Sequence, residues 1–119
     1  MNYYQIIAIT ILIFIHLYIM YIEMMLWNTK KGMKIFGLRS KEFADETKVL
    51  AANQGLYNGF LGAGLLWSLI IQNKDVALFF LIFIFIAGIF GAYSTKKITI
   101  LYFQTIPSLI AIFLILSDL

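Results

Sequence analysis

The sequence predicts an all-α membrane protein, an antiparallel bundle of four transmembrane helices. Three observations point to this fold class. The chain of 119 residues is 62% hydrophobic and only 13% charged, whereas soluble globular domains are about 25% charged. Its apolar residues form four blocks, each close to the roughly 20 residues that a helix needs to cross about 30 Å of hydrocarbon. Basic residues gather in two of the three segments between these blocks.

The four expected spans fill almost the whole chain. They occupy residues 4–26, 50–71, 76–92 and 98–116, and residues 27–49 form a cytoplasmic loop. No basic stretch precedes the first span and no small-residue cleavage site follows it, so we expect that span to be retained. Residues 1–119 therefore form a single transmembrane domain.

Charge predicts the orientation of the bundle. The first loop carries Lys30, Lys31, Lys34, Arg39, Lys41 and Lys48, and the last loop carries Lys96 and Lys97. The other side has only Lys74. Basic loops stay in the cytoplasm, so both termini are expected outside the cell membrane. Anionic headgroups of the inner leaflet, rather than nucleic acid, are the expected partners of these charges.

Local signals define the start of the second span and the turn after it. Ser40 is predicted to cap a helix that begins near Lys41 in the cytoplasm and continues into the membrane, with carboxylates in its first turns. Residues 72–75 then form a tight external turn, which requires antiparallel neighbours.

The run from Asn53 to Asn58 is the most unusual feature of the chain, because it puts three amides and a phenol into an expected span. An unpaired amide or hydroxyl in hydrocarbon costs several kcal/mol. Counting about 1.5 Å per residue places the polar residues of three spans in the inner half of the membrane. The predicted ligand-binding residues are His16, Glu23, Asn53, Gln54, Tyr57, Asn58 and Gln104.

Small residues predict where helices approach closely. Gln54 and Asn58 form one ridge of the second span, and a ridge of small residues lies beside it. Pro107 removes a backbone donor one turn after Gln104, so we expect a kink that opens space beside the polar layer. Glycine-rich faces permit a homodimer without requiring one. The predicted packing positions are Gly55, Gly59, Gly88, Gly91 and Pro107.

Two readings remain open for each ionisable residue of this layer. Glu23 is either a proton carrier or cation-binding carboxylate, or a shallow acid that reaches the interface or pairs with Lys30 or Lys31. His16 either relays protons or ligates a metal, or is a neutral imidazole bonded to Asn58 or Gln104.

Metal and cofactor chemistry is not predicted. Glu23 and His16 lie about 10 Å apart along a helix, too far to share one ion. The chain has no cysteine, which excludes disulfides and thiolate sites. No nucleophile lies beside the histidine, so an enzyme is disfavoured.

The chain resembles the bacterial four-span membrane family catalogued as domain of unknown function 1304. The resemblance is carried by His16, Glu23 with Trp27 four residues on, the block 53–58, Ala87-Gly88 with Gly91-Ala92, and Gln104 with Pro107. It implies a compact four-helix protein of the bacterial inner membrane, and it implies no activity.

Two functional hypotheses follow from these residues. In the first, the polar layer is an inner-leaflet cavity that binds a small amphipathic or polar ligand, and proton-coupled transport of that ligand is one version of this hypothesis. In the second, the protein is a structural or regulatory subunit whose polar layer only fixes helix packing.

Overall fold

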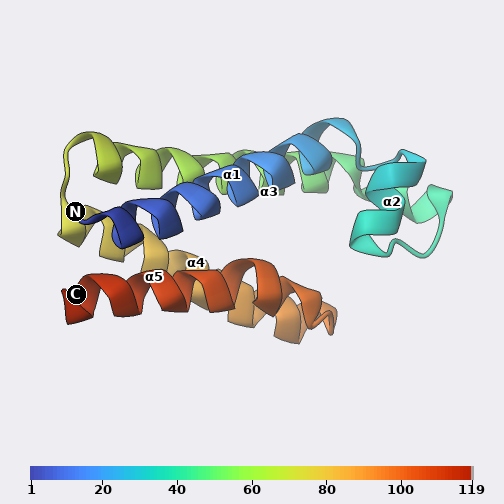
Figure 1. Cartoon of the computed structure of the whole chain (residues 1–119). Helices are drawn as coiled ribbons and strands as arrows, with labels where there is room; N and C mark the ends of the chain where they lie inside the picture. Colours follow the sequence, from blue (N-terminus) through green and yellow to red (C-terminus); the bar gives the residue numbers. More distant parts are fainter. Residues whose placement is uncertain (119) are drawn as a thin grey trace. The chain divides into compact units, whose positions relative to one another are not determined.

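The structure, a computed structural model, describes residues 1–118 and contains only helices and their connecting turns there, so the predicted all-α class is confirmed. Figure 1 shows the helices in order along the chain. They are α1 (Tyr3–Met25), α2 (Lys30–Phe36), α3 (Lys41–Ile70), α4 (Lys74–Thr95), the π-helical turn η1 (Leu101–Thr105) and α5 (Ile106–Ser117). Leu119, the last residue of the predicted domain, lies outside the described residues.

Within residues 1–118, two helices are long and apolar enough to cross a bilayer, α1 and α4. Residues Leu101–Ser117 form a shorter apolar helix. The longest helix, α3, begins with charged turns and contains the amide block, which lowers its mean hydropathy. Large apolar side chains such as Phe14 and Phe90 are exposed, as expected of helices that face lipid. The four-span arrangement stays a prediction.

Side-chain caps explain where α3 and α4 begin. The Oγ of Ser40 accepts a hydrogen bond from the backbone N–H of Phe43 at 3.0 Å. This confirms that Ser40 caps the helix that begins at Lys41. Asn73 caps α4 by accepting from the N–H of Val76 at 3.0 Å. The external turn is shorter than predicted, because Lys74 already belongs to α4.

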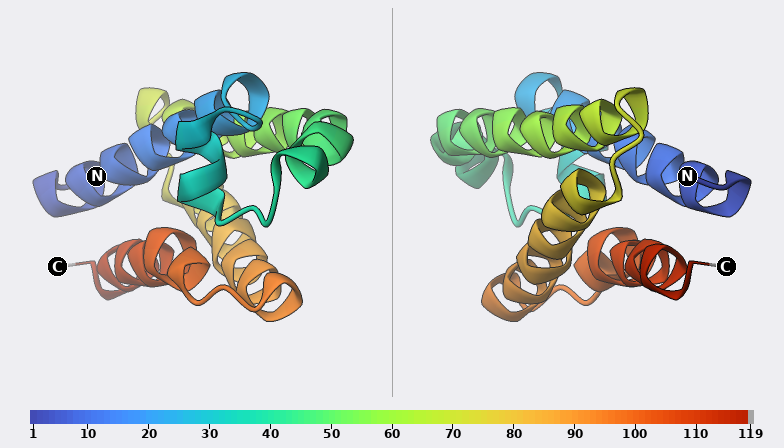
Figure 2. Two further views of the ribbon diagram at one scale, coloured as in Figure 1. Left: turned by 90° about the vertical axis from the view of Figure 1, so that its right-hand side faces the viewer. Right: turned by 90° about the vertical axis from the view of Figure 1, so that its left-hand side faces the viewer.

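The loop 27–49 contains a helix that the sequence did not predict. At the start of α2, the Thr29 side chain accepts from the N–H of Gly32. At its end, Gly37 adopts the left-handed conformation with φ 61°, which glycine tolerates best. Gly32 lies against the carbonyl group of Leu26, where a Cβ atom would overlap the carbonyl oxygen. The helix connects the end of α1 to the turn before α3 (Figure 2).

The residues form two compact units, which we describe separately. The first comprises Met1–Ile15 and Leu61–Leu119, and the second comprises His16–Phe60. The apolar core of the first unit is made by Ile9, Leu12, Ile13, Leu65, Ala77, Leu81, Ile84, Ala111 and Ile115. A fully buried polar residue, Gln5, joins α1 to α5 in this unit, because its Nε2 donates to the carbonyl oxygen of Leu114 at 3.0 Å.

Pro107 is accommodated by η1. The N–H of Ile106 donates to the carbonyl of Leu101, five residues back, so the helix widens by one residue just before the proline. Pro107 then lies in the first turn of α5, directly after this wider turn. Thr105, at the end of η1, donates its hydroxyl to the carbonyl of Phe85 at 3.3 Å. The irregularity predicted at Pro107 is therefore a π-helical turn packed against α4.

Candidate functional site

A buried carboxylate is the centre of the candidate site. Glu23, near the end of α1, is only 1% exposed. Its Oε2 accepts a hydrogen bond from Nε2 of Gln54 at 2.9 Å, and its Oε1 accepts one from Nδ2 of Asn58 at 2.7 Å. Asn58 is itself buried, at 8% exposure, and also donates to the backbone carbonyl of Gln54. We call Glu23, Gln54 and Asn58 the carboxylate cluster.

The helical period of α3 explains this geometry. Gln54 and Asn58 are four residues apart, so their side chains lie one turn apart on the same face. Each amide can therefore reach a different oxygen of one carboxylate. Both donors come from α3 and the acceptor comes from α1, so the cluster joins the two helices within the second unit.

Two glycines of α3 make room for the cluster. A Cβ atom on Gly55 would lie 3.0 Å from the Cβ of Glu23 and 3.2 Å from the carbonyl oxygen of Met20. A Cβ atom on Gly59 would overlap the sulfur of Met20. These glycines therefore allow α1 to lie close enough to α3 for the short amide side chain of Asn58 to reach Glu23.

The carboxylate cluster contains no cation. The ion pairs within residues 1–118 are Lys41 with Asp45 and Lys74 with Asp118, and neither involves Glu23. The sequence had left open that Glu23 reaches the interface or pairs with a lysine of the loop. Instead its oxygens are held by neutral amide donors, which offset part of the cost of burying a charge.

The other predicted site residues take no part in the two hydrogen bonds to Glu23. His16 is fully buried in the second unit, and no buried side-chain nitrogen or oxygen in residues 1–118 lacks a partner. Asn53 and Tyr57 are exposed on α3. The ring of Tyr57 lies 6.0 Å from that of Phe60. Gln104 belongs to η1, in the first unit.

Sequence reasoning missed a second polar arrangement, at Trp27. Its Nε1 donates to the hydroxyl of Thr47 at 2.9 Å, and that hydroxyl donates to the carbonyl of Phe43 at 2.7 Å. The Trp27 ring also contacts Phe36 of α2, with ring centroids 4.9 Å apart. The sequence contained a signal for it, because Trp27 follows Glu23 by one helical turn and its indole requires an acceptor.

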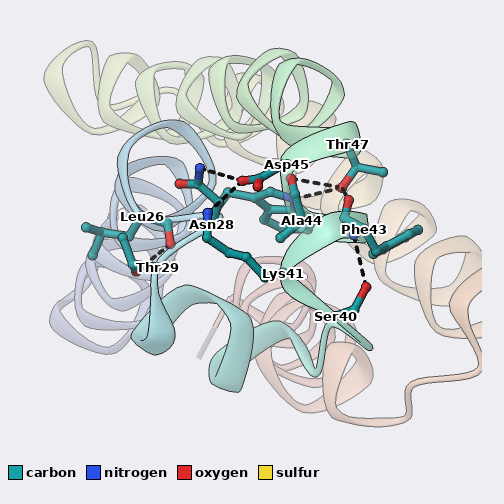
Figure 3. A network of polar contacts seen from close by, with 10 residues as sticks. Leu26, Asn28, Thr29, Ser40, Lys41, Phe43, Ala44, Asp45 and Thr47 are labelled. Carbon is teal, nitrogen blue, oxygen red and sulfur yellow. Dashed lines mark hydrogen bonds and ion pairs between the residues drawn. The ribbon is translucent and has the colours of Figure 1, made fainter.

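Asp45 anchors a neighbouring contact between the loop and α3 (Figure 3). It accepts from Nδ2 of Asn28 at 2.9 Å and from Nζ of Lys41 at 2.7 Å. The hydrogen bond from Lys41, and then that from Asn28, hold the pKa of Asp45 below its usual value. The loop that follows α1 is thus attached to the first turns of α3 at two points, Trp27 and Asn28.

Nothing in residues 1–118 groups three or more His, Asp or Glu side chains in a way that would hold a metal ion. The chemistry of the carboxylate cluster is that of an acceptor. A carboxylate can accept hydrogen bonds from N–H groups, and it can also bind a proton or a cation. Each amide beside it offers both a donor and an acceptor. In the cluster, both oxygens of Glu23 accept from amide donors.

Comparison with known proteins identifies the family but no activity. A family model described as protein of unknown function (DUF1304) matches residues 10–116, a range that includes the whole carboxylate cluster. The uncharacterized protein YpaA of Lactococcus lactis subsp. lactis (strain IL1403) is 29% identical over 87 residues, which cover 71% of this chain and 73% of that relative. No solved structure matches. The chain belongs to the DUF1304 family of proteins of unknown function.

Proposed function

We propose that this chain is a four-span protein of the bacterial inner membrane, with both termini outside, that binds a small amphipathic or polar ligand at Glu23. One observation supports this most directly. Glu23 is buried with its two oxygens held by neutral amides, and no lysine or arginine is paired with it. Ionisable groups inside membrane segments are expensive, and they commonly serve binding or proton transfer.

The ligand class follows from the donors and acceptors of the cluster. A ligand with a positive charge or an N–H group would replace one amide at the carboxylate, and the released amide would bond a polar group of the ligand. Protons compete for the same oxygens. Exchange of a proton for such a ligand is the step that a proton-coupled transporter requires, and His16, two helical turns away on α1, is our candidate for the second proton-binding group.

A structural role is the second candidate, and a different observation favours it. The buried side-chain nitrogen and oxygen atoms in residues 1–118 all have partners within the chain. The carboxylate cluster would then only fix the register of α1 against α3. In that case the protein is a structural or regulatory subunit, and its activity belongs to a partner protein.

Equilibrium dialysis with tetraphenylphosphonium, an amphipathic cation, tests the ligand-binding proposal. The wild-type protein should bind the probe less as pH is lowered, because protons and the probe compete for Glu23. Glu23→Gln should remove this binding. The matched control is Glu42→Gln, which neutralises an exposed carboxylate in the first turn of α3 and should leave binding unchanged.

Two outcomes separate the candidates. If Glu23→Gln binds the probe as the wild type does, but melts at a lower temperature, the structural role is supported and the binding site is refuted. If binding is lost while uptake into vesicles is the same in the wild type, Glu23→Gln and His16→Ala, the protein binds the cation but does not transport it by proton exchange.

A further inference from the structure

Two apolar grooves lie at opposite ends of α4, both within the first unit. The groove near the end of α4 has a volume of about 450 Å³. Its walls are Ile89, Ala92, Tyr93, Lys96, Ile98 and Leu101. The groove near the start of α4 has a volume of about 510 Å³ and includes Trp67, Asp75 and Phe79 in its walls. Neither groove contains a residue of the carboxylate cluster.

The groove near the end of α4 is open on its outer side. Tyr93 is 82% exposed and Ile98 is 60% exposed, although both belong to its walls. A soluble ligand is normally enclosed on most sides by its pocket. An apolar surface that is open along one side, on a helix apolar enough to cross a bilayer, instead fits a hydrocarbon chain that is itself surrounded by lipid.

Lys96 gives this groove a charge. The side chain is exposed and takes part in neither of the two ion pairs within residues 1–118. Its backbone ends α4 in the left-handed conformation, with φ 59°, where glycine is the usual residue. A lysine at this position has an unfavourable backbone conformation, yet it places a positive charge at the end of an apolar groove.

We propose that the groove near the end of α4 binds an anionic phospholipid, with one acyl chain against Ile89, Ala92 and Leu101 and the phosphate at Lys96. Basic groups beside membrane helices attract anionic headgroups in this way. The site is separate from Glu23 and does not depend on the ligand proposed there. It depends only on α4 lying in a bilayer.

The groove near the start of α4 provides an internal comparison. It has similar volume and apolar walls, but the charged residue in its walls is Asp75. The neighbouring Lys74 is paired with Asp118. Anionic lipid should therefore prefer the groove at Lys96, whereas neutral lipid should not distinguish the two grooves by charge.

Native mass spectrometry of the full-length protein in detergent tests the proposal. The protein is mixed with equal amounts of phosphatidylglycerol and phosphatidylcholine that carry identical acyl chains, and the retained lipids are counted. We expect phosphatidylglycerol to be retained about fivefold over phosphatidylcholine, the ratio that corresponds to one lysine near a headgroup. Lys96→Gln should reduce the ratio to about one, and Lys96→Arg should restore it.

Three controls keep the result interpretable. Lys74→Gln removes a charge that is paired with Asp118 at the start of α4 and should leave the ratio unchanged. Ala92→Phe fills the groove and should reduce retention of both lipids. Lys96→Gly relieves the backbone and should raise the melting temperature while it abolishes the preference. The proposal is overturned if Lys96→Gln and Lys74→Gln behave alike, or if glycerol phosphate, which has no acyl chain, displaces the lipid.

Discussion

Among the residues of the second unit, the buried carboxylate of Glu23 places the strongest demand on its neighbours, because each of its oxygens needs a hydrogen-bond donor. A carboxylate removed from water needs a donor for each oxygen. Gln54 and Asn58 supply one donor each, but they do so from different environments. Asn58 is buried, whereas Gln54 is exposed. The two hydrogen bonds should therefore contribute unequally to the free energy of unfolding.

Leucine substitutions measure that inequality. Asn58→Leu leaves Oε1 of Glu23 without its donor in a buried site, which should lower the free energy of unfolding by about 1–3 kcal/mol. Gln54→Leu should cost less, because another donor can reach the exposed side of the cluster. Asn53→Leu, which changes an exposed amide one position away, should cost close to nothing. Denaturant unfolding in detergent gives the three values, and equal costs for all three would contradict the proposed role of burial.

Asp45 provides a prediction about pH. Its pKa is lowered mainly by the hydrogen bond from Lys41 and next by that from Asn28. A carboxyl group whose pKa is lower in the folded state stabilises the fold above its unfolded pKa, and this contribution is lost as pH falls through the folded pKa. Lys41→Ala should therefore raise the pKa of Asp45 more than Asn28→Ala does. Carbon-13 NMR titration of the carboxyl group measures both shifts, and an unchanged pKa in Lys41→Ala would refute the assignment.

At the scale of helices, α4 shows that two glycines with similar sequence surroundings differ in what they contact. Gly88 faces η1, where an added Cβ atom would overlap the hydroxyl of Thr105 and lie 2.9 Å from its backbone nitrogen. Gly91 faces Ile100, where the nearest atom would be 3.4 Å away. Both were predicted as positions of close approach, but only Gly88 contacts backbone.

Alanine substitutions distinguish the two glycines. Gly88→Ala should destabilise the protein by about 1–3 kcal/mol, because η1 must move away from α4. Gly91→Ala should be neutral or stabilising by up to about 1 kcal/mol, because alanine favours the helix. Thermal unfolding of the two variants in the same detergent provides the measurement. If Gly91→Ala lowers the melting temperature more than Gly88→Ala does, η1 does not pack on α4 as described.

The sequence predicted some of these elements well, and the physical reasons are clear. Ser40 marks the start of α3 because a cap is a local signal, and the spacing of Gln54 and Asn58 is fixed by the helical period. The helix α2 was not predicted, because its signals, Thr29 and Gly37, enclose a segment of only a few residues within the predicted cytoplasmic loop. Counting residues along a helix predicts the depth of a side chain in the membrane but not which side of the helix it occupies. Asn53 was therefore predicted as a site residue together with Gln54, although of the two only Gln54 bonds Glu23.

The predicted orientation of the molecule in the membrane has a simple test, because of its composition. The chain has no cysteine, so single cysteines can be introduced without background. A membrane-impermeant maleimide should label Asp75→Cys in intact cells, and should label Lys34→Cys and Thr95→Cys only after permeabilisation. Labelling of Asp75 and Lys34 from the same side would contradict four spans with both termini outside.

The contacts at Trp27 and Asp45 have a consequence for proteolysis. Residues 30–48 contain six basic residues, each a cleavage site for trypsin, which needs an extended and unattached segment of backbone. Here α2 and the first turns of α3 keep most of that backbone helical. The Trp27–Thr47 hydrogen bond also links a residue before this segment to a residue near its end. Trypsin should therefore leave this segment of the folded protein uncut, and Thr47→Val, which removes the indole's acceptor, should be cut within it.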